Sequence, residues 1–112
     1  MAVSPDYRAW VLEQLARVGP VTSRGMFGGV GLYLDGLFFG LIDDDTLYFK
    51  VDDATRPDYE AAGMGPFRPY DDERAMQYYE IPPDVLEDAE QMRIWTNRAL
   101  EVARRAAKGK RR

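Results

Sequence analysis

Residues 24–50 form the most apolar part of the chain, and turn sequences divide them into short runs. Short apolar runs rich in aromatic and β-branched residues predict β-strands when turn residues bound them. Asp35-Gly36 stands between Leu34 and Leu37, which favours a two-residue type I′ turn because that turn requires positive φ at both positions. The sequence therefore predicts a β-hairpin whose two strands meet at this turn.

The turn also predicts the register of the strands. It places Gly31 opposite Gly40, and either a two- or a four-residue turn within residues 43–46 pairs Ile42 with Leu47. In this register both faces of the sheet are apolar. We therefore expect helices, another strand layer or a second subunit to cover each face.

The remaining pattern predicts helices at both ends of the chain. Ser4-Pro5 is a typical helix start, and apolar residues then recur at helical spacing as far as Gly19. The sequence also predicts strands over 21–27 and 75–81, and an irregular segment or edge strand over 64–72. A short helix is expected between them, capped by Asp53 or Thr55 and ended by Gly63. The last prediction is a helical region over 85–106 that either continues or breaks near Asp88. The predicted fold class is α+β: an N-terminal helix, an antiparallel sheet of about five strands with a short helix, and C-terminal helices packed on the sheet.

Composition narrows the chemistry that the chain can perform. It has 112 residues, enough for one domain, with no cysteine and no histidine. Disulfides, thiolate metal sites and the most common general base are therefore excluded, and the acidic residues near positions 43–45 and 52–53 lie at expected turns where nothing desolvates them. We expect no enzyme, no cofactor and no metal. No apolar run approaches the roughly 20 residues of a membrane helix, so we expect a cytoplasmic protein.

The net charge of −4 conceals an asymmetry between the two ends of the chain. Residues 104–112 carry six basic side chains and no acidic one, and subtracting that +6 leaves −10 on residues 1–103. We expect residues 1–103 to form the domain and residues 104–112 to be a disordered tail, the only part able to attract a nucleic-acid backbone. The candidate contacts are Arg104, Arg105, Lys108, Lys110, Arg111 and Arg112.

A second candidate surface lies on the sheet. Arg24 and Lys50 are charged residues within predicted strands, and Tyr79 belongs to a tyrosine-rich run. Basic and aromatic residues on one sheet face would suit single-stranded nucleic acid, although basic side chains extending from a sheet edge explain them more simply. A glycine pair within an apolar face would leave room for another backbone, so we expect a homodimer. The candidate interaction residues are Arg24, Phe27, Gly31, Gly40, Lys50 and Tyr79.

Several fragments, in this order and spacing, resemble the N-terminal domain of the TfoX/Sxy competence regulators. The fragments are Arg24-Gly25-Met26-Phe27-Gly28-Gly29-Val30-Gly31-Leu32-Tyr33, Asp35-Gly36, Phe39-Gly40-Leu41, Leu47-Tyr48-Phe49-Lys50, Pro66-Phe67, Tyr78-Tyr79-Glu80-Ile81-Pro82 and Trp95. The resemblance covers nearly the whole chain and implies a compact α+β fold. The resemblance implies that full-length members regulate natural transformation together with the cyclic-AMP receptor protein and carry a second, helical domain. The fragments found here match only the first domain, so we expect a single-domain member. The family motif brings no catalytic residues.

These observations together predict a non-enzymatic, TfoX-like regulatory domain that acts by protein association in bacterial transcriptional regulation, with competence as a narrower possibility. The expected partner is a second copy of the chain or a transcription factor. One alternative is a nucleic-acid-binding protein that uses the basic C-terminal tail. A second alternative is a small-ligand or metal-dependent enzyme.

Overall fold

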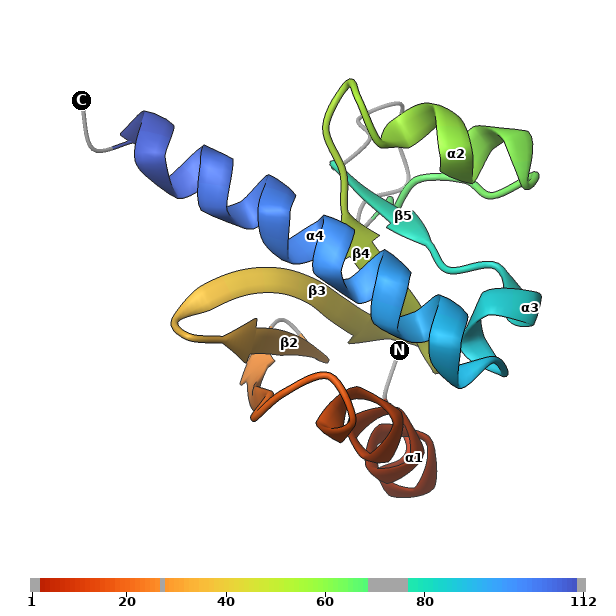
Figure 1. The fold of residues 1–112 in the computed structure, drawn as a ribbon. Coiled ribbons are helices and arrows are strands. Elements are labelled where there is room, and N and C mark those ends of the chain that lie inside the picture. Colours follow the sequence, from red (N-terminus) through yellow and green to blue (C-terminus); the bar gives the residue numbers. More distant parts are fainter. Residues whose placement is uncertain (1–2, 27, 69–76, 111–112) are drawn as a thin grey trace.

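The computed structural model describes residues 3–26, 28–68 and 77–110. Within them, five strands form one antiparallel sheet in the order β1-β2-β3-β4-β5, accompanied by helices (Figure 1). The elements are α1 (Pro5–Ala16), β1 (Thr22–Met26), β2 (Gly29–Leu34), β3 (Leu37–Asp43), β4 (Thr46–Lys50), α2 (Arg56–Ala61), β5 (Tyr78–Glu80), α3 (Pro83–Leu86) and α4 (Ala89–Lys110). The predicted α+β fold is confirmed.

Side-chain caps fix the starts of the long helices. The Ser4 hydroxyl accepts a hydrogen bond from the Tyr7 backbone N–H at 3.2 Å, so α1 begins where the sequence predicts. The Asp88 carboxylate likewise accepts from the Gln91 backbone N–H at 3.0 Å. The predicted break near Asp88 therefore separates α3 from α4.

Strand boundaries differ slightly from the sequence prediction. β1 ends at Met26, and Phe27 lies outside the described residues. The described part of the last strand is Tyr78–Glu80, while residues 69–76 are also outside the description. Pro66 pairs with Tyr79 in an isolated bridge, so the segment before this gap continues the sheet beyond β5, as the edge-strand alternative predicts.

The hairpin turn is as predicted, but the register beyond it is not. Asp35 and Gly36 have φ values of 54° and 77°, as a type I′ turn requires. Tyr33 pairs with Phe38, but the register then shifts between Leu32 and Tyr33. A β-bulge therefore interrupts the ladder, because Gly40 and not Phe39 pairs with Leu32.

The bulge corrects the predicted glycine pair. Gly31 lies opposite Leu41 instead of Gly40. The extra residue in β3 reverses the alternation of side chains, which directs Ile42 toward the buried side of the sheet together with its predicted partner Leu47. The sequence prediction missed this shift because it assumed regular one-to-one pairing of the two strands from the turn onward.

All the described helices contribute to one core on one face of the sheet. α4 crosses this face over β3 and β4 (Figure 1). The fully buried members of the cluster, all under 2% exposed, are Val11, Leu15, Leu32, Phe39, Ile42, Leu47, Phe49, Met92 and Ala99. We expected both faces of the sheet to be covered. The described helices cover only one, because all of them pack on this side.

The end of α4 corrects a further expectation. The helix continues through Lys110, so residues 104–110 are helical and not a disordered tail. Val102 and Ala103 are 3% and 5% exposed, which anchors this part of the helix on the core. Beyond them Arg105 forms an ion pair with Asp52 at 2.6 Å, a contact between residues far apart in the sequence.

We predict that Gly36→Ala destabilises the domain relative to Gly65→Ala by about 1 to 2 kcal/mol, because only position 36 imposes a left-handed backbone. A Cβ at either position meets no atom within 4 Å, so crowding does not contribute, and Gly36 has φ +77°. Both variants restrict the unfolded chain equally, so their difference isolates the backbone strain. Chemical denaturation measures it, and equal midpoints would contradict the predicted turn geometry.

Candidate functional site

The face of the sheet opposite the helices presents two rows of side chains. Directly paired residues of neighbouring strands point to the same side, so the register defines the members of each row. The first row crosses all the strands as Arg24, Gly31, Leu41, Tyr48 and Glu80, and the second contains Tyr33, Phe38, Lys50 and Tyr78. We call these residues, with the neighbouring Phe67, the aromatic face.

Aromatic rings on this face contact one another. Tyr33 and Phe38 are stacked with ring centres 5.1 Å apart, and Phe38 lies 5.5 Å from the ring centre of Tyr78. Tyr48 and Phe67 form a separate pair at 5.0 Å. These distances are typical of favourable aromatic pairs, so two groups of rings stabilise contacts between segments that are far apart in the sequence.

Two cations lie over the outer rings of this surface. The Arg24 guanidinium carbon is 5.5 Å from the ring centre of Tyr33, and the Lys50 ammonium nitrogen is 5.0 Å from that of Tyr78. Lys50 also donates a hydrogen bond to the Tyr78 hydroxyl at 3.4 Å. Burial, with a smaller contribution from Tyr33, raises the pKa of Tyr78 to about 12, so this hydroxyl is uncharged at neutral pH.

Burial varies across the aromatic face. Arg24 is exposed, and the rings of Tyr33, Phe38 and Tyr48 are half-buried. Leu41 and Tyr78 are 8% and 6% exposed although neither belongs to the core under the helices. The face thus has half-buried rings around a buried Leu41, with charged side chains beside them, a mixture of apolar and charged groups that protein interfaces also show.

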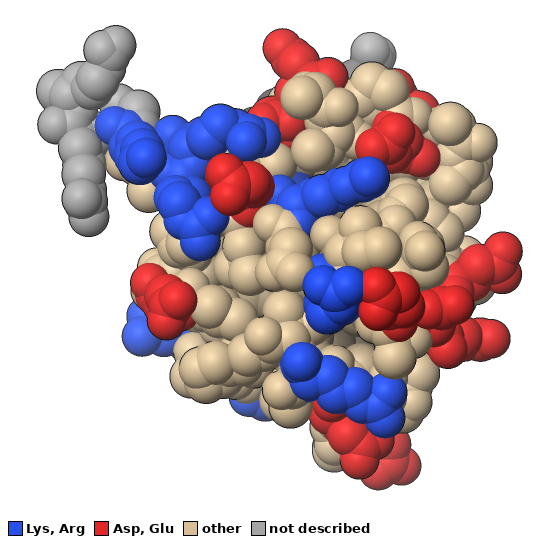
Figure 2. All heavy atoms as spheres, in the orientation of Figure 1, with Lys and Arg blue, Asp and Glu red and all other residues tan. Residues whose placement is uncertain are grey.

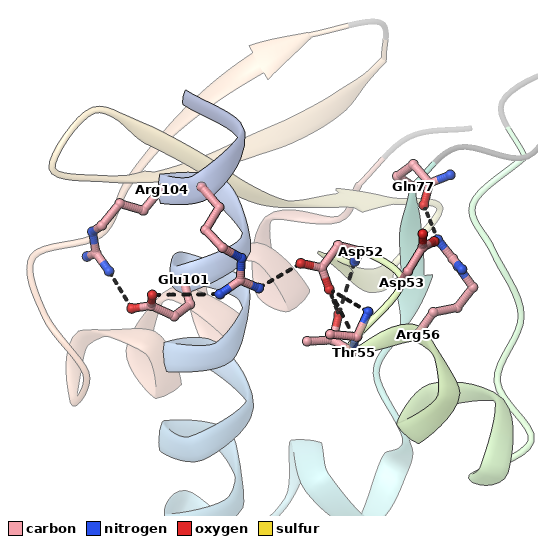
Figure 3. Close-up of polar contacts among 9 residues, drawn as sticks. Asp52, Asp53, Thr55, Arg56, Gln77, Glu101 and Arg104 are labelled. Carbon is pink, nitrogen blue, oxygen red and sulfur yellow. Dashed lines mark hydrogen bonds and ion pairs between the residues drawn. The ribbon is translucent and has the colours of Figure 1, made fainter. Parts of the chain in front are cut away.

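A second candidate region lies where α4 meets the segment between β4 and α2 (Figure 3). Thr55 is the N-cap residue of α2, as one of the two sequence alternatives predicts, although its side chain makes no capping bond to the helix. Asp52 caps the turn before it: its carboxylate accepts from the backbone N–H groups of Ala54 and Thr55 at 3.1 and 3.0 Å. The Thr55 hydroxyl in turn accepts from the Asp52 backbone N–H at 3.1 Å. This reciprocal arrangement is a capping box, and it fixes the start of the turn that leads into α2.

Asp52 also joins this turn to the C-terminal half of α4. Arg105 donates a hydrogen bond to the second carboxylate oxygen of Asp52 at 2.6 Å. The Arg105 bond, followed in importance by the backbone bond from Thr55, holds the pKa of Asp52 below its ordinary value, against the effect of partial burial. One carboxylate therefore fixes both the start of α2 and the position of the basic end of α4.

A groove of about 440 Å³ lies beside this contact. Its charged lining residues are Lys50, Asp52, Asp53, Arg56 and Arg105. Carboxylates pair with two of these cations: Arg56 contacts Asp53 at 2.9 Å, and Arg105 contacts Asp52. The groove therefore has little positive charge to offer an anion.

Basic side chains gather at the C-terminal end of α4, and acidic side chains lie close to them (Figure 2). Arg104 pairs with Glu101 at 2.8 Å, and Arg105 approaches the same carboxylate at 3.8 Å. Lys108 is exposed, while the side chain of Lys110 and all of Arg111 and Arg112 lie outside the description. Two of the six predicted nucleic-acid contacts are thus already paired with carboxylates.

The structure separates the residues that the sequence grouped into one interaction surface. Arg24, Gly31 and Lys50 lie on the aromatic face. Tyr79 lies on the helix-covered face, where its hydroxyl donates to Glu60 at 3.2 Å. Gly40 also faces that side, in the same row as Leu32.

Sequence reasoning missed the residues that dominate the aromatic face: Tyr33, Phe38, Leu41, Tyr48, Phe67 and Tyr78. The alternation of side chains from Tyr48 to Lys50 on β4 would have identified that part of the face, because β4 contains no bulge. For β3 the same signal was misleading, since the bulge lies between Phe38 and Leu41.

A metal site and a membrane span are not found in the described parts of the chain. No group of three or more acidic, histidine or cysteine side chains there is arranged to hold a metal ion. The described helices also include none with the length and hydropathy that crossing a bilayer demands.

The architecture defines a small α+β domain whose helices pack on one face of an antiparallel sheet. The family model of the TfoX N-terminal domain matches residues 13–103, and the chain therefore belongs to this family. The match confirms the resemblance found in the sequence. A search of curated proteins gives no match.

We predict that Asp52→Ala lowers the free energy of unfolding by about 1 to 2 kcal/mol, because it removes the cap of the turn before α2. The matched control is Asp53→Ala, which removes the neighbouring carboxylate, 97% exposed, and its surface ion pair with Arg56. We expect this control to cost less than about 0.5 kcal/mol. Urea denaturation of both variants tests the difference, and similar losses would contradict the role of Asp52.

A comparison of the wild type with Asp52→Asn tests the pKa of Asp52. A carboxyl whose pKa is lower in the folded than in the unfolded state stabilises the fold above its unfolded pKa. This stabilisation is lost as pH falls through the lower, folded pKa. The stability advantage of the wild type over Asp52→Asn should therefore be full near neutral pH and shrink under acid conditions, whereas an advantage that is independent of pH would contradict it.

Proposed function

We propose that this TfoX-family domain is a non-enzymatic, cytoplasmic regulatory domain that acts by protein association in bacterial transcriptional regulation. The resemblance suggests competence promoters as the narrower setting. The single observation that carries the proposal is the aromatic face, a partly exposed apolar surface opposite the core. A face of this kind is typical of binding surfaces for other proteins.

The aromatic face suits a protein better than single-stranded nucleic acid. Bases bind by stacking on exposed rings, but Tyr33 and Phe38 stack on each other, and Tyr78 is 6% exposed. Glu80 lies in the same row as Arg24, so the face also carries a negative charge that would repel phosphates. Apolar contact with a second protein needs only the accessible part of the half-buried rings, and it does not require phosphates to approach Glu80.

We predict that Tyr33→Arg abolishes the capture of the protein's partner from a native lysate, because it places a second cation beside Arg24 on the apolar face. The matched control is Asn97→Arg, which adds the same charge at an exposed position of α4. Capture should decrease at least about tenfold in the first variant and stay unchanged in the second. Nuclease treatment should have no effect, whereas loss of capture after nuclease would contradict protein association.

The second candidate function is nucleic-acid binding by the basic end of α4, which the cluster of basic side chains favours (Figure 2). Six phosphate contacts would give a slope of log affinity against log salt of roughly −5. Because Arg104 and Arg105 are paired with carboxylates and the rest of the chain is acidic, we expect weaker, sequence-independent binding with a slope of about −3 to −4.

Fluorescence anisotropy with a labelled duplex at several salt concentrations measures this slope. We predict that Lys108→Ala reduces its magnitude by about 1, while Arg93→Ala, near the other end of α4, leaves it unchanged. Nanomolar binding to a defined promoter at about 150 mM salt that survives deletion of residues 104–112 would overturn this expectation and the protein-association proposal together.

A further inference from the structure

The first row of the aromatic face is complementary to itself. It runs from a cation on β1, the first strand of the sheet, to an anion on β5, the last named strand, which pairs on its other side with the segment around Pro66. Between them lie Gly31 on β2, Leu41 on the central strand β3, and Tyr48 on β4. The row therefore has a positive end, a position without a side chain, an apolar centre, a large ring and a negative end.

A two-fold axis parallel to β3 converts this order into complementary contacts. Such an axis lays β1 of one copy over β5 of the other and β2 over β4. Arg24 then faces Glu80 of the second copy, and the Tyr48 ring faces the second copy's Gly31, which has no side chain to oppose it. Leu41 meets Leu41 at the centre, so each position in the row has a matching partner.

The dimensions allow both charge pairs to form together. Neighbouring strands lie about 4.8 Å apart, so Arg24 and Glu80 are about 19 Å apart and equally far from β3. Packed sheets lie about 10 Å apart, a gap that an arginine and a glutamate side chain can span together. The second row matches in the same way, since Tyr33 on β2 would face the Lys50 ammonium of the second copy.

We infer that the aromatic face binds a second copy of this chain, in a two-fold dimer held by reciprocal Arg24–Glu80 pairs. The inference rests on the proposal that the domain acts by protein association, and it names one partner. It replaces the glycine-pair contact expected from the sequence, because Gly40 belongs to the other face. The face is only five strands wide, so we expect a dimer of micromolar affinity.

Sedimentation of the purified full chain over a range of micromolar concentrations tests the inference. The mass should rise from 12.8 kDa toward twice that value. Arg24→Glu and Glu80→Arg should each weaken self-association about tenfold, because each replaces two attractive pairs by repulsive ones. An equimolar mixture of the two variants should restore it, since every pair between the unlike chains is attractive again.

Matched controls carry the same charge changes away from the face. Glu13 is an exposed residue within α1, and Arg17 is exposed at its end. Glu13→Arg and Arg17→Glu should therefore leave the dimer unchanged. Thermal melting establishes that each variant folds. A wild-type mass of 12.8 kDa at every concentration, or a mixture that associates no better than the single variants, overturns the inference.

A second measurement does not depend on charge reversal. The chain has no cysteine, so Arg24→Cys and Glu80→Cys each introduce the single reactive thiol of their chain. A bismaleimide that spans about 10 Å should join the mixture of the two variants about tenfold faster than either variant alone. Equal rates overturn the inference.

The two proposals fail in different ways. If the purified chain is monomeric but Tyr33→Arg still abolishes capture of a lysate partner, the face binds another protein and the dimer is rejected. If the dimer forms and no lysate protein depends on the face, the dimer stands while regulation through a further protein does not.

Discussion

The β-bulge in β3 is the constraint on which the two faces of this domain depend. By adding one residue between Phe38 and Gly40, it reverses the alternation of side chains along the rest of the strand. Ile42 therefore enters the core beneath the helices, while Leu41 is placed on the opposite face with Tyr48. Without the bulge these two residues would exchange sides, and the aromatic face would have a different centre.

The helices follow from this division of the sheet. α1, α2, α3 and α4 all bury apolar residues in the cluster on one side, so the structure needs only one core, as expected for a chain of this length. Asp52 then links the far end of α4 to the turn before α2 by accepting hydrogen bonds from both. The basic end of α4 is thus part of the folded domain, with some of its charge neutralised by neighbouring carboxylates.

The chain belongs to the TfoX N-terminal domain family, and its described sheet face opposite the helices is rich in aromatic side chains. The aromatic face concentrates the features that suit a protein partner: half-buried rings, and charges of opposite sign at its two edges. The basic end of α4 is a weaker candidate, because ion pairs within the domain already occupy Arg104 and Arg105.

The sequence by itself determined the local features of this protein. Ser4 as a cap, Pro5 at a helix start, Asp35-Gly36 as a turn and the break near Asp88 depend on neighbouring residues alone, and all were predicted correctly. Only the tertiary structure decided the register beyond Tyr33, the side of the sheet that the helices cover and the helical state of residues 104–110. These depend on contacts between distant residues, such as Asp52 with Arg105, which no local pattern specifies. For the candidate site, the sequence identified Arg24 and Lys50 as unusual charged residues within strands. It did not identify the rings beside them, because only the pairing of the strands brings those rings into contact.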